Sequence, residues 1–115
     1  MCLNSIIMNL LDICKSVRRK KLALEGSIEG TCREVTLAIA YQATQQGLDV
    51  CICFGTYQTQ PHYWIRHSDK IYDATVSQFG VDDEVYVVEE VNGARYKEEG
   101  HIYASGARLG PLLNT

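Results

Sequence analysis

A cysteine at the predicted start of a helix is the first residue in this sequence that could do chemistry. In the stretch G-T-C-R-E-V, residues 30–35, a threonine precedes Cys32 and a glutamate follows that threonine by three places. Thr31 and Glu34 fit the capping-box pattern, so we expect Cys32 to be the first helical residue. Unpaired N–H groups and the helix dipole would stabilise a thiolate there, and the thiolate is the nucleophilic form. The plainer alternative is that Cys32 is a small apolar residue in the core.

A base and an orienting group for such a thiol occur together in a later segment. A thiol nucleophile needs a base within hydrogen-bond reach, and the base is usually oriented by a third group. The segment H-Y-W-I-R-H-S-D-K-I-Y-D, residues 62–73, fits two strands joined at Ser68-Asp69. With a two-residue turn, side-chain alternation places His62 and Asp73 on one face as diagonal neighbours. A three-residue loop would place them on opposite faces, so the predicted Cys-His-Asp triad depends on the register.

Other histidines and cysteines compete for these roles. His67 would point away from the face that carries His62, and His101 lies in a C-terminal segment that the pattern does not assign. Cys51 and Cys53 share one face of a strand expected beneath the second helix, so we interpret them as core residues. The same interpretation applies to Cys2 and Cys14.

The elements that must position these residues follow from periodicity. Apolar residues recur at helical spacing over residues 3–17 and predict a first helix. The second helix should run from about Cys32 to Gln46, with Gly47 as its C-terminal cap. The chain then changes to β-branched and aromatic segments, which predict strands. These strands are expected at residues 49–57, 62–67, 70–75, 84–91 and 94–97.

The order of these elements predicts the fold class. Asn92-Gly93 is a strong signal for a two-residue hairpin between the last two strands. Trp64 is expected in the core, beneath the second helix. Helices followed by successive antiparallel strands predict an α+β domain with helices packed on one face of an antiparallel sheet.

Composition limits the classes of protein. Its 115 residues are expected to form a single domain, 1–115, with a net charge of −3 from 14 acidic and 11 basic residues. Nothing in this balance predicts a nucleic acid or membrane partner. No apolar stretch reaches the length of a membrane span, and no secretory signal is recognised. The five cysteines are odd in number, lack disulfide-framework spacing and lack a C-x-x-C pair, so we expect a cytoplasmic protein with no metal and no cofactor.

The motifs together resemble a known group of enzymes. G-T-C at a helix start, H-Y-W on a strand and Y-D on the next strand resemble the catalytic core of the transglutaminase-like superfamily, which belongs with the papain-like cysteine enzymes. The resemblance covers Gly30 to Phe79. It implies a transglutaminase-like/papain-like core in which Cys32 is the nucleophile, His62 the general base and then acid, and Asp73 the orienting group.

The chain departs from the family at one feature. Members usually carry a side-chain donor upstream of the cysteine that helps to hold the oxyanion, and no Trp or Gln precedes Cys32 here. Backbone N–H groups at the start of the helix are the expected substitute.

The resemblance implies acyl transfer or hydrolysis on a peptide or protein amide, by protease, deamidase or transglutaminase chemistry. The alternative is a non-catalytic binding module that retains the transglutaminase-like fold. A third hypothesis is a redox or metal role for Cys51 and Cys53. The sequence leaves the substrate and the oligomeric state open.

Overall fold

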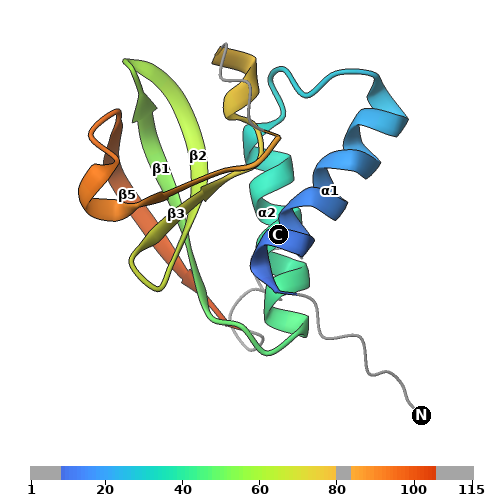
Figure 1. The fold of residues 1–115 in the computed structure, drawn as a ribbon, viewed down its shortest axis with the longest axis horizontal. Coiled ribbons are helices and arrows are strands. Elements are labelled where there is room, and N and C mark those ends of the chain that lie inside the picture. The colour runs from blue at the N-terminus through green and yellow to red at the C-terminus, as the bar shows by residue number, and fades with distance from the viewer. Residues whose placement is uncertain (1–8, 80–83, 106–115) are drawn as a thin grey trace.

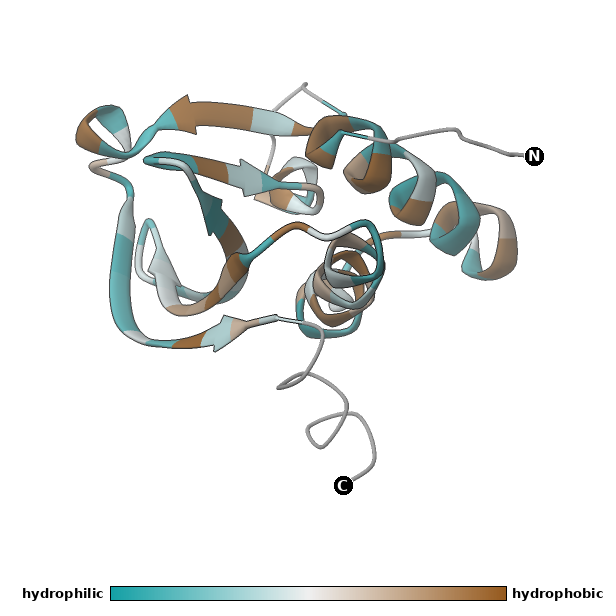
Figure 2. Ribbon diagram, turned by 90° about the horizontal axis from the view of Figure 1, so that it is seen from below, coloured by the Kyte–Doolittle hydropathy of each residue, from teal (hydrophilic) through white to brown (hydrophobic). Residues whose placement is uncertain are grey.

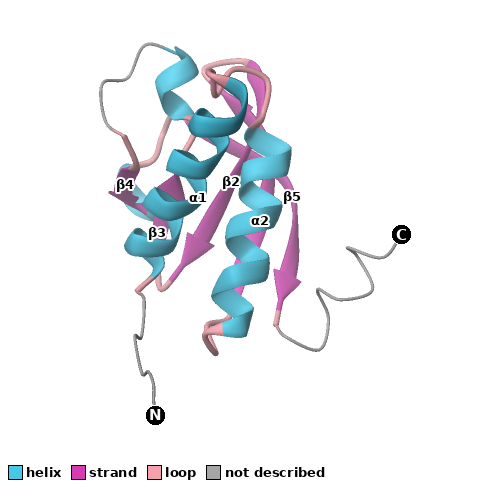
Figure 3. Ribbon diagram, turned by 90° about the vertical axis from the view of Figure 1, so that its right-hand side faces the viewer, coloured by secondary structure: helices cyan, strands magenta, loops and turns pink. Residues whose placement is uncertain are grey.

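Two helices lie on one face of a five-stranded antiparallel sheet in the structure, a computed structural model that describes residues 9–79 and 84–105 (Figure 1). The helices α1 (Leu10–Glu25) and α2 (Cys32–Gln45) precede all of the strands in the chain. Figure 3 shows them side by side in front of the sheet. The predicted α+β class, with helices packed on one face of an antiparallel sheet, is confirmed. No helix in the described part of the chain is long and apolar enough to cross a membrane.

The first helix extends further along the chain than the prediction. Asn9 caps α1 by accepting a hydrogen bond from the backbone N–H of Asp12 at 2.8 Å, and Gly26 ends it with a φ of 74°. The prediction stopped at residue 17, where the apolar stripe ends, but the basic residues that follow are good helix formers. Residues 3–8 of the predicted helix lie outside the described residues. The buried residues of α1 are Leu10, Ile13, Cys14 and Val17.

The second helix begins at Cys32 as predicted, but the capping box is wrong. The backbone of Thr31 has φ −109° and ψ 10°, which is not the extended conformation of a capping residue, and its side chain makes no cap hydrogen bond. Its hydroxyl instead donates to the carbonyl of Ile28, which lies in the preceding turn. Glu34 pairs with Lys21 of α1 at 2.6 Å. The first turn of α2 is therefore left without a side-chain cap.

The five strands form a single antiparallel sheet. Their order across the sheet is β4-β3-β2-β1-β5, so β4 and β5 are the edges. The turn at Ser68-Asp69 has two residues, both with positive φ, and His67 pairs with Lys70 as predicted. The strand bounds are β1 (Val50–Tyr57), β2 (Gln60–His67), β3 (Lys70–Asp73), β4 (Tyr86–Glu89) and β5 (Tyr96–Ala104).

The predicted hairpin at Asn92-Gly93 is wrong. A short 3₁₀ turn, η2 (Glu90–Asn92), follows β4, and Gly93 has a φ of −93° where a type I′ turn needs a positive angle. β5 pairs with β1 instead of β4, and it includes His101, which the prediction left unassigned. Tertiary pairing along the whole length of β1 therefore overrides the local turn signal.

The two faces of the sheet carry different clusters of buried residues. Ile52 and Ile65 pack with the helices. Their strand neighbours Cys53 and Trp64 point the other way, because side chains alternate along a strand, and they pack with Ile71. Both are buried, as predicted for core residues, but the prediction that they lie beneath the helix is wrong. Figure 2 shows apolar and polar residues interspersed along the helices, which lie to one side of the curved sheet.

Candidate active site

The structure places Cys32, His62 and Asp73 together. Cys32 is the first residue of α2, and its side chain is half-buried. His62 lies near the start of β2, and Asp73 ends β3. Nε2 of His62 lies 2.6 Å from Oδ2 of Asp73. The two-residue turn between β2 and β3 is what brings the imidazole and the carboxylate onto the same face.

His62 is held in an aromatic environment. The residue is 1 % exposed, and its ring centroid lies 5.0 Å from that of Phe79 and 6.2 Å from that of Trp64. Phe79 belongs to η1 (Val76–Phe79), which follows β3. These rings exclude water and restrict the imidazole to one orientation.

Asp73 has donors on both carboxylate oxygens. Oδ1 accepts from the backbone N–H of Thr75 at 3.0 Å and from the Thr75 hydroxyl at 3.3 Å. Oδ2 accepts from the hydroxyl of Tyr96 at 2.8 Å in addition to the contact with His62. The hydrogen-bonding capacity of this buried carboxylate is therefore satisfied.

The bond to Asp73 decides which ring nitrogen of His62 serves the thiol. Nε2 is taken by the carboxylate, while Nδ1 is buried and has no hydrogen-bond partner of ordinary geometry among the described residues. The Cys32 thiol lies close enough to the ring to shift the pKa of both groups. Nδ1 is therefore the nitrogen left to exchange a proton with the sulfur.

The interaction between thiol and imidazole favours their charged forms. Burial is the largest influence on the pKa of Cys32 and raises it, but the neighbouring His62 imidazole and backbone N–H groups together lower it by more. Those come from Tyr63 and Arg33, and the net result is a Cys32 pKa below the ordinary 9.0. For His62, burial lowers the pKa, but the hydrogen bond with Asp73 and the nearby Cys32 thiol raise it to about 9. The pair thus shifts the balance from thiol and neutral imidazole toward thiolate and imidazolium.

The other described thiols with shifted pKa values are perturbed in the opposite direction. Burial, with the charge of Asp73, raises the pKa of Cys14 to about 12. Burial, with the neighbouring Glu98, raises the pKa of Cys53 well above its ordinary value. Both side chains are buried, so the prediction that Cys14 and Cys53 are core residues is confirmed. Cys51 is half-buried, and Cys2 lies outside the described residues.

The competing histidines are separate from this cluster. His67 lies next to the β2–β3 turn, where its Nδ1 contacts the carbonyl of Asp49 at 2.8 Å. His101 is an exposed residue of β5, and its Nδ1 lies 2.8 Å from a carboxylate oxygen of Glu98. Neither ring contacts Cys32, so the ranking of His62 above them agrees with their positions.

Two residues of this cluster were missed by sequence reasoning. Tyr96 comes from the far edge strand, and Gln78 comes from η1. Oε1 of Gln78 accepts from the backbone N–H of Gly30 at 3.2 Å, and its Nε2 is buried without a partner in the described part of the chain. No local signal in the sequence marks Gln78 as an amide donor, because it follows Cys32 far along the chain and reaches the start of α2 only in the folded protein.

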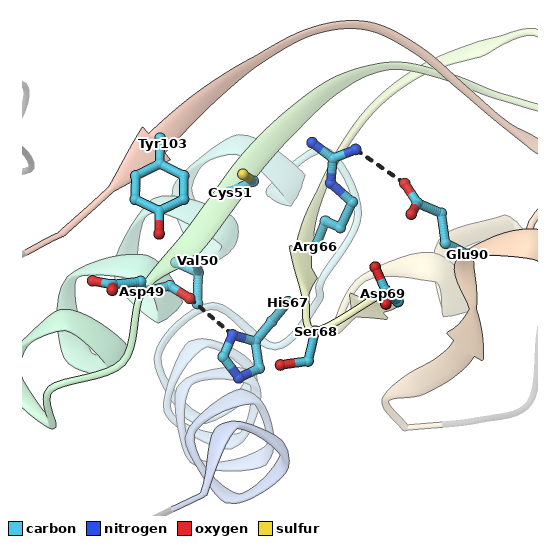
Figure 4. A pocket seen from close by; sticks show the side chains of 9 residues that line it. All are labelled: Asp49, Val50, Cys51, Arg66, His67, Ser68, Asp69, Glu90 and Tyr103. Carbon is cyan, nitrogen blue, oxygen red and sulfur yellow. Dashed lines mark hydrogen bonds and ion pairs between the residues drawn. The ribbon is translucent and has the colours of Figure 1, made fainter.

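A cavity of about 390 Å³ lies elsewhere, between the start of β1 and the end of β2, near the Ser68-Asp69 turn (Figure 4). Cys51 and Arg66 line it. The guanidinium of Arg66 is already paired with Glu90 at 3.0 Å and with Glu98 at 3.2 Å. The cavity therefore offers no unpaired positive charge to an anionic ligand.

The described residues give the redox or metal hypothesis no further support. Among them, no group of three or more His, Cys, Asp or Glu side chains is arranged to hold a metal ion. Cys51 and Cys53 differ in exposure, because Cys51 lines the cavity whereas Cys53 is fully buried.

Comparison of the chain with protein-family models, curated proteins and solved structures found no match. The interpretation of the site therefore rests on its geometry and chemistry.

Proposed function

We propose that this protein is a cysteine-dependent hydrolase or acyltransferase with a transglutaminase-like/papain-like core, acting on a peptide or protein amide. Cys32 is the nucleophile, His62 the general base and acid, and Asp73 the group that orients the imidazole. The observation that carries the proposal is a buried His62–Asp73 hydrogen bond of 2.6 Å beside a half-buried thiol at a helix start. Catalytic pairs of thiol and imidazole are held in this way.

The reaction would begin with attack of the Cys32 thiolate on the amide carbonyl carbon. The carbon–nitrogen bond then breaks, the imidazolium of His62 gives its proton to the departing amine, and a thioester remains on the sulfur. Water or a second amine attacks the thioester while His62 accepts its proton, and the carbon–sulfur bond breaks. Hydrolysis and transamidation thus use the same three side chains.

Stabilisation of the oxyanion would come from the uncapped first turn of α2. The Thr31 hydroxyl donates to the carbonyl of Ile28 and does not cap the helix, so backbone N–H groups in that turn have no capping side chain as acceptor. Preorganised N–H donors in a partly desolvated site are the usual means of stabilising a tetrahedral intermediate. These donors replace the upstream side chain that this sequence lacks.

The first test is selective alkylation of the native protein with iodoacetamide near neutral pH, read by peptide mass spectrometry. Cys32 should be labelled first, and His62→Ala should slow its labelling. Preferential labelling of Cys51, the other half-buried cysteine in the described part of the chain, would contradict the proposal.

A second assay identifies the reaction. The protein is incubated with glutamine-containing peptides in the presence and absence of a primary amine, and the products are identified by mass. Cleavage, deamidation and amine incorporation correspond to protease, deamidase and transglutaminase activity. The Cys32→Ser variant should lose whichever activity is found.

The alternative, a binding module with the same fold and no turnover, predicts an apolar surface over Cys32. The large apolar side chains that are exposed in the described residues are spread over α1, α2, β4, η2 and β5 and do not form one such surface. They are Leu24, Tyr41, Val87, Val91, Ile102 and Tyr103. This favours the enzyme, and a Cys32 that is alkylated rapidly but turns over no peptide amide would favour the binding module.

A further inference from the structure

We propose that Tyr96 is a positioning residue for this chemistry, which limits how strongly Asp73 holds the proton on His62. The inference rests on the proposed function, because it concerns the same cluster. It adds a fourth side chain, from β5, to the three residues of the triad.

The carboxylate of Asp73 is divided between two sets of partners. Among the residues that the structure describes, Oδ1 accepts only from Thr75, through its backbone N–H and its hydroxyl, and Thr75 is two residues further along the chain. Oδ2 accepts from Tyr96 at 2.8 Å and faces His62 at 2.6 Å. Thr75 therefore already fixes the orientation of the carboxylate. What Tyr96 adds is a second donor on the oxygen that faces the imidazole.

The phenol reaches Asp73 across the sheet. β5 and β3 are separated by β2 and β1 in the strand order. The contact therefore requires the sheet to curve, with the Tyr96 side chain on the face that carries Trp64. The ring packs edge-on against Trp64 at 5.0 Å and Tyr57 at 4.8 Å between centroids. This packing fixes where the hydroxyl points.

The phenol acts only as a donor to this carboxylate. Burial and the charge of Asp73 raise the pKa of Tyr96 far above its ordinary value, so the hydroxyl keeps its proton throughout the pH range in which thiol and imidazole titrate. A donor on Oδ2 withdraws negative charge from the oxygen that binds the imidazolium. The proton on His62 is held less tightly as a result, and it can pass to a departing amine.

Other titratable groups approach this cluster from β1, β4 and α1. Tyr57 of β1 and Tyr86 of β4 lie close enough to raise the pKa of Tyr96, and Asp73 lies close enough to raise the pKa of Cys14 in α1. Since burial and that charge raise the pKa of Cys14 to about 12, its thiol is neutral at neutral pH. The guanidinium of Arg18 in α1 also lies near Asp73, since it donates to the carbonyl of Ala74 at 2.7 Å, and the variants in the tests below leave it in place. The charged groups that titrate in the test are thus His62 and Cys32.

The test is Tyr96→Phe, which removes one oxygen and keeps the ring. The His62 imidazole is titrated by NMR, and the rate of Cys32 alkylation by iodoacetamide is measured as a function of pH. The His62 inflection should rise by about 0.5–1 unit, and the thiolate inflection of Cys32 should move to lower pH. Unchanged inflections, or a shift of His62 to lower pH, would overturn the inference.

Tyr57→Phe is the matched control. Tyr57 is 1 % exposed and packs against the same ring, but its hydroxyl does not contact Asp73. It should leave both inflections in place. A comparable shift in this control would assign the effect to loss of any buried hydroxyl and would refute a specific role for Tyr96.

A double-mutant cycle with Asp73→Asn shows whether Tyr96 acts through the carboxylate. In that background Tyr96→Phe should produce no further shift of His62, because the charge that the phenol modulates is gone. A full shift there would refute the inference. Failure of the proposed function is distinguished by His62→Ala in otherwise wild-type protein. If that change leaves the rate of Cys32 alkylation unaltered, the proposed triad itself is refuted.

Discussion

Replacing Asp73 by asparagine should uncouple His62 from Cys32 without changing the shape of the side chain. The backbone N–H of Thr75 can only donate, so the asparagine oxygen should occupy the place of Oδ1. Its NH₂ group then faces Nε2 of His62 and the hydroxyl of Tyr96. Nε2 must become an acceptor, and the proton of the neutral ring moves to Nδ1. That nitrogen is the one that Cys32 needs as a base.

The size of the effect follows from the bond that is lost. A hydrogen bond to a charged group contributes about 1.5–3 kcal/mol, and one pKa unit corresponds to about 1.4 kcal/mol. The pKa of His62, which is raised to about 9, should therefore fall by about 1–2 units. The pKa of Cys32 should rise because the imidazolium that stabilises its thiolate is lost. Alkylation of Cys32 at neutral pH should slow by roughly 10–100-fold.

The assay is the second-order rate of iodoacetamide alkylation of Cys32, followed from acidic to alkaline pH by peptide mass spectrometry. Glu34→Gln is the control, since Glu34 lies two residues from Cys32 on the same helix but is exposed and pairs with Lys21. It should leave the profile unchanged. A profile for Asp73→Asn that superimposes on the wild type, in protein with an unchanged circular dichroism spectrum, would refute the coupling.

Three further predictions concern stability. In Cys32→Ala, His62 keeps the hydrogen bond with Asp73 that raises its pKa above the ordinary 6.5. Between 6.5 and the raised value the folded state should bind more protons than the unfolded state, so the free energy of unfolding should fall as pH rises through that window. In the wild type this fall is offset, because the lowered pKa of Cys32 makes the free energy of unfolding rise with pH. Urea titrations across the window distinguish the two cases. Gly55→Ala should destabilise the fold by about 3 kcal/mol or more in urea titration, because its Cβ would lie 1.9 Å from the backbone carbonyl oxygen of Lys97; a loss below about 1 kcal/mol would contradict this packing. Cys14→Ser should lower the melting temperature through loss of about 1–3 kcal/mol, by burying a hydroxyl in an apolar site, while leaving the alkylation rate of Cys32 unchanged; a slower rate would show that Cys14 contributes to the site.

The sequence predicted those parts of the fold in which a local pattern and a tertiary contact agree. The helical stripe located α2, although the helix ends at Gln45 with Gln46 as its C-terminal cap and not the predicted Gly47. The alternation around Ser68-Asp69 predicted the β2–β3 register. The prediction at Asn92-Gly93 was wrong because the turn signal is local, whereas the pairing of β5 with β1 joins segments far apart in the chain. The Thr31 cap was wrong for a related reason, since a carbonyl of the preceding loop takes the hydroxyl.

The candidate site divides in the same way. Sequence by itself determined that Cys32 would lie at a helix start and that His62 and Asp73 would share a face, because the apolar spacing of a helix and the side-chain alternation of a strand are short-range patterns. Only the tertiary structure decided that Nε2 of His62 binds Asp73, that Tyr96 joins the same carboxylate and that the pKa values of thiol and imidazole move in opposite directions. These properties depend on burial and on distances between elements that meet only when the sheet curves and α2 packs on it. No spacing along the chain encodes such distances.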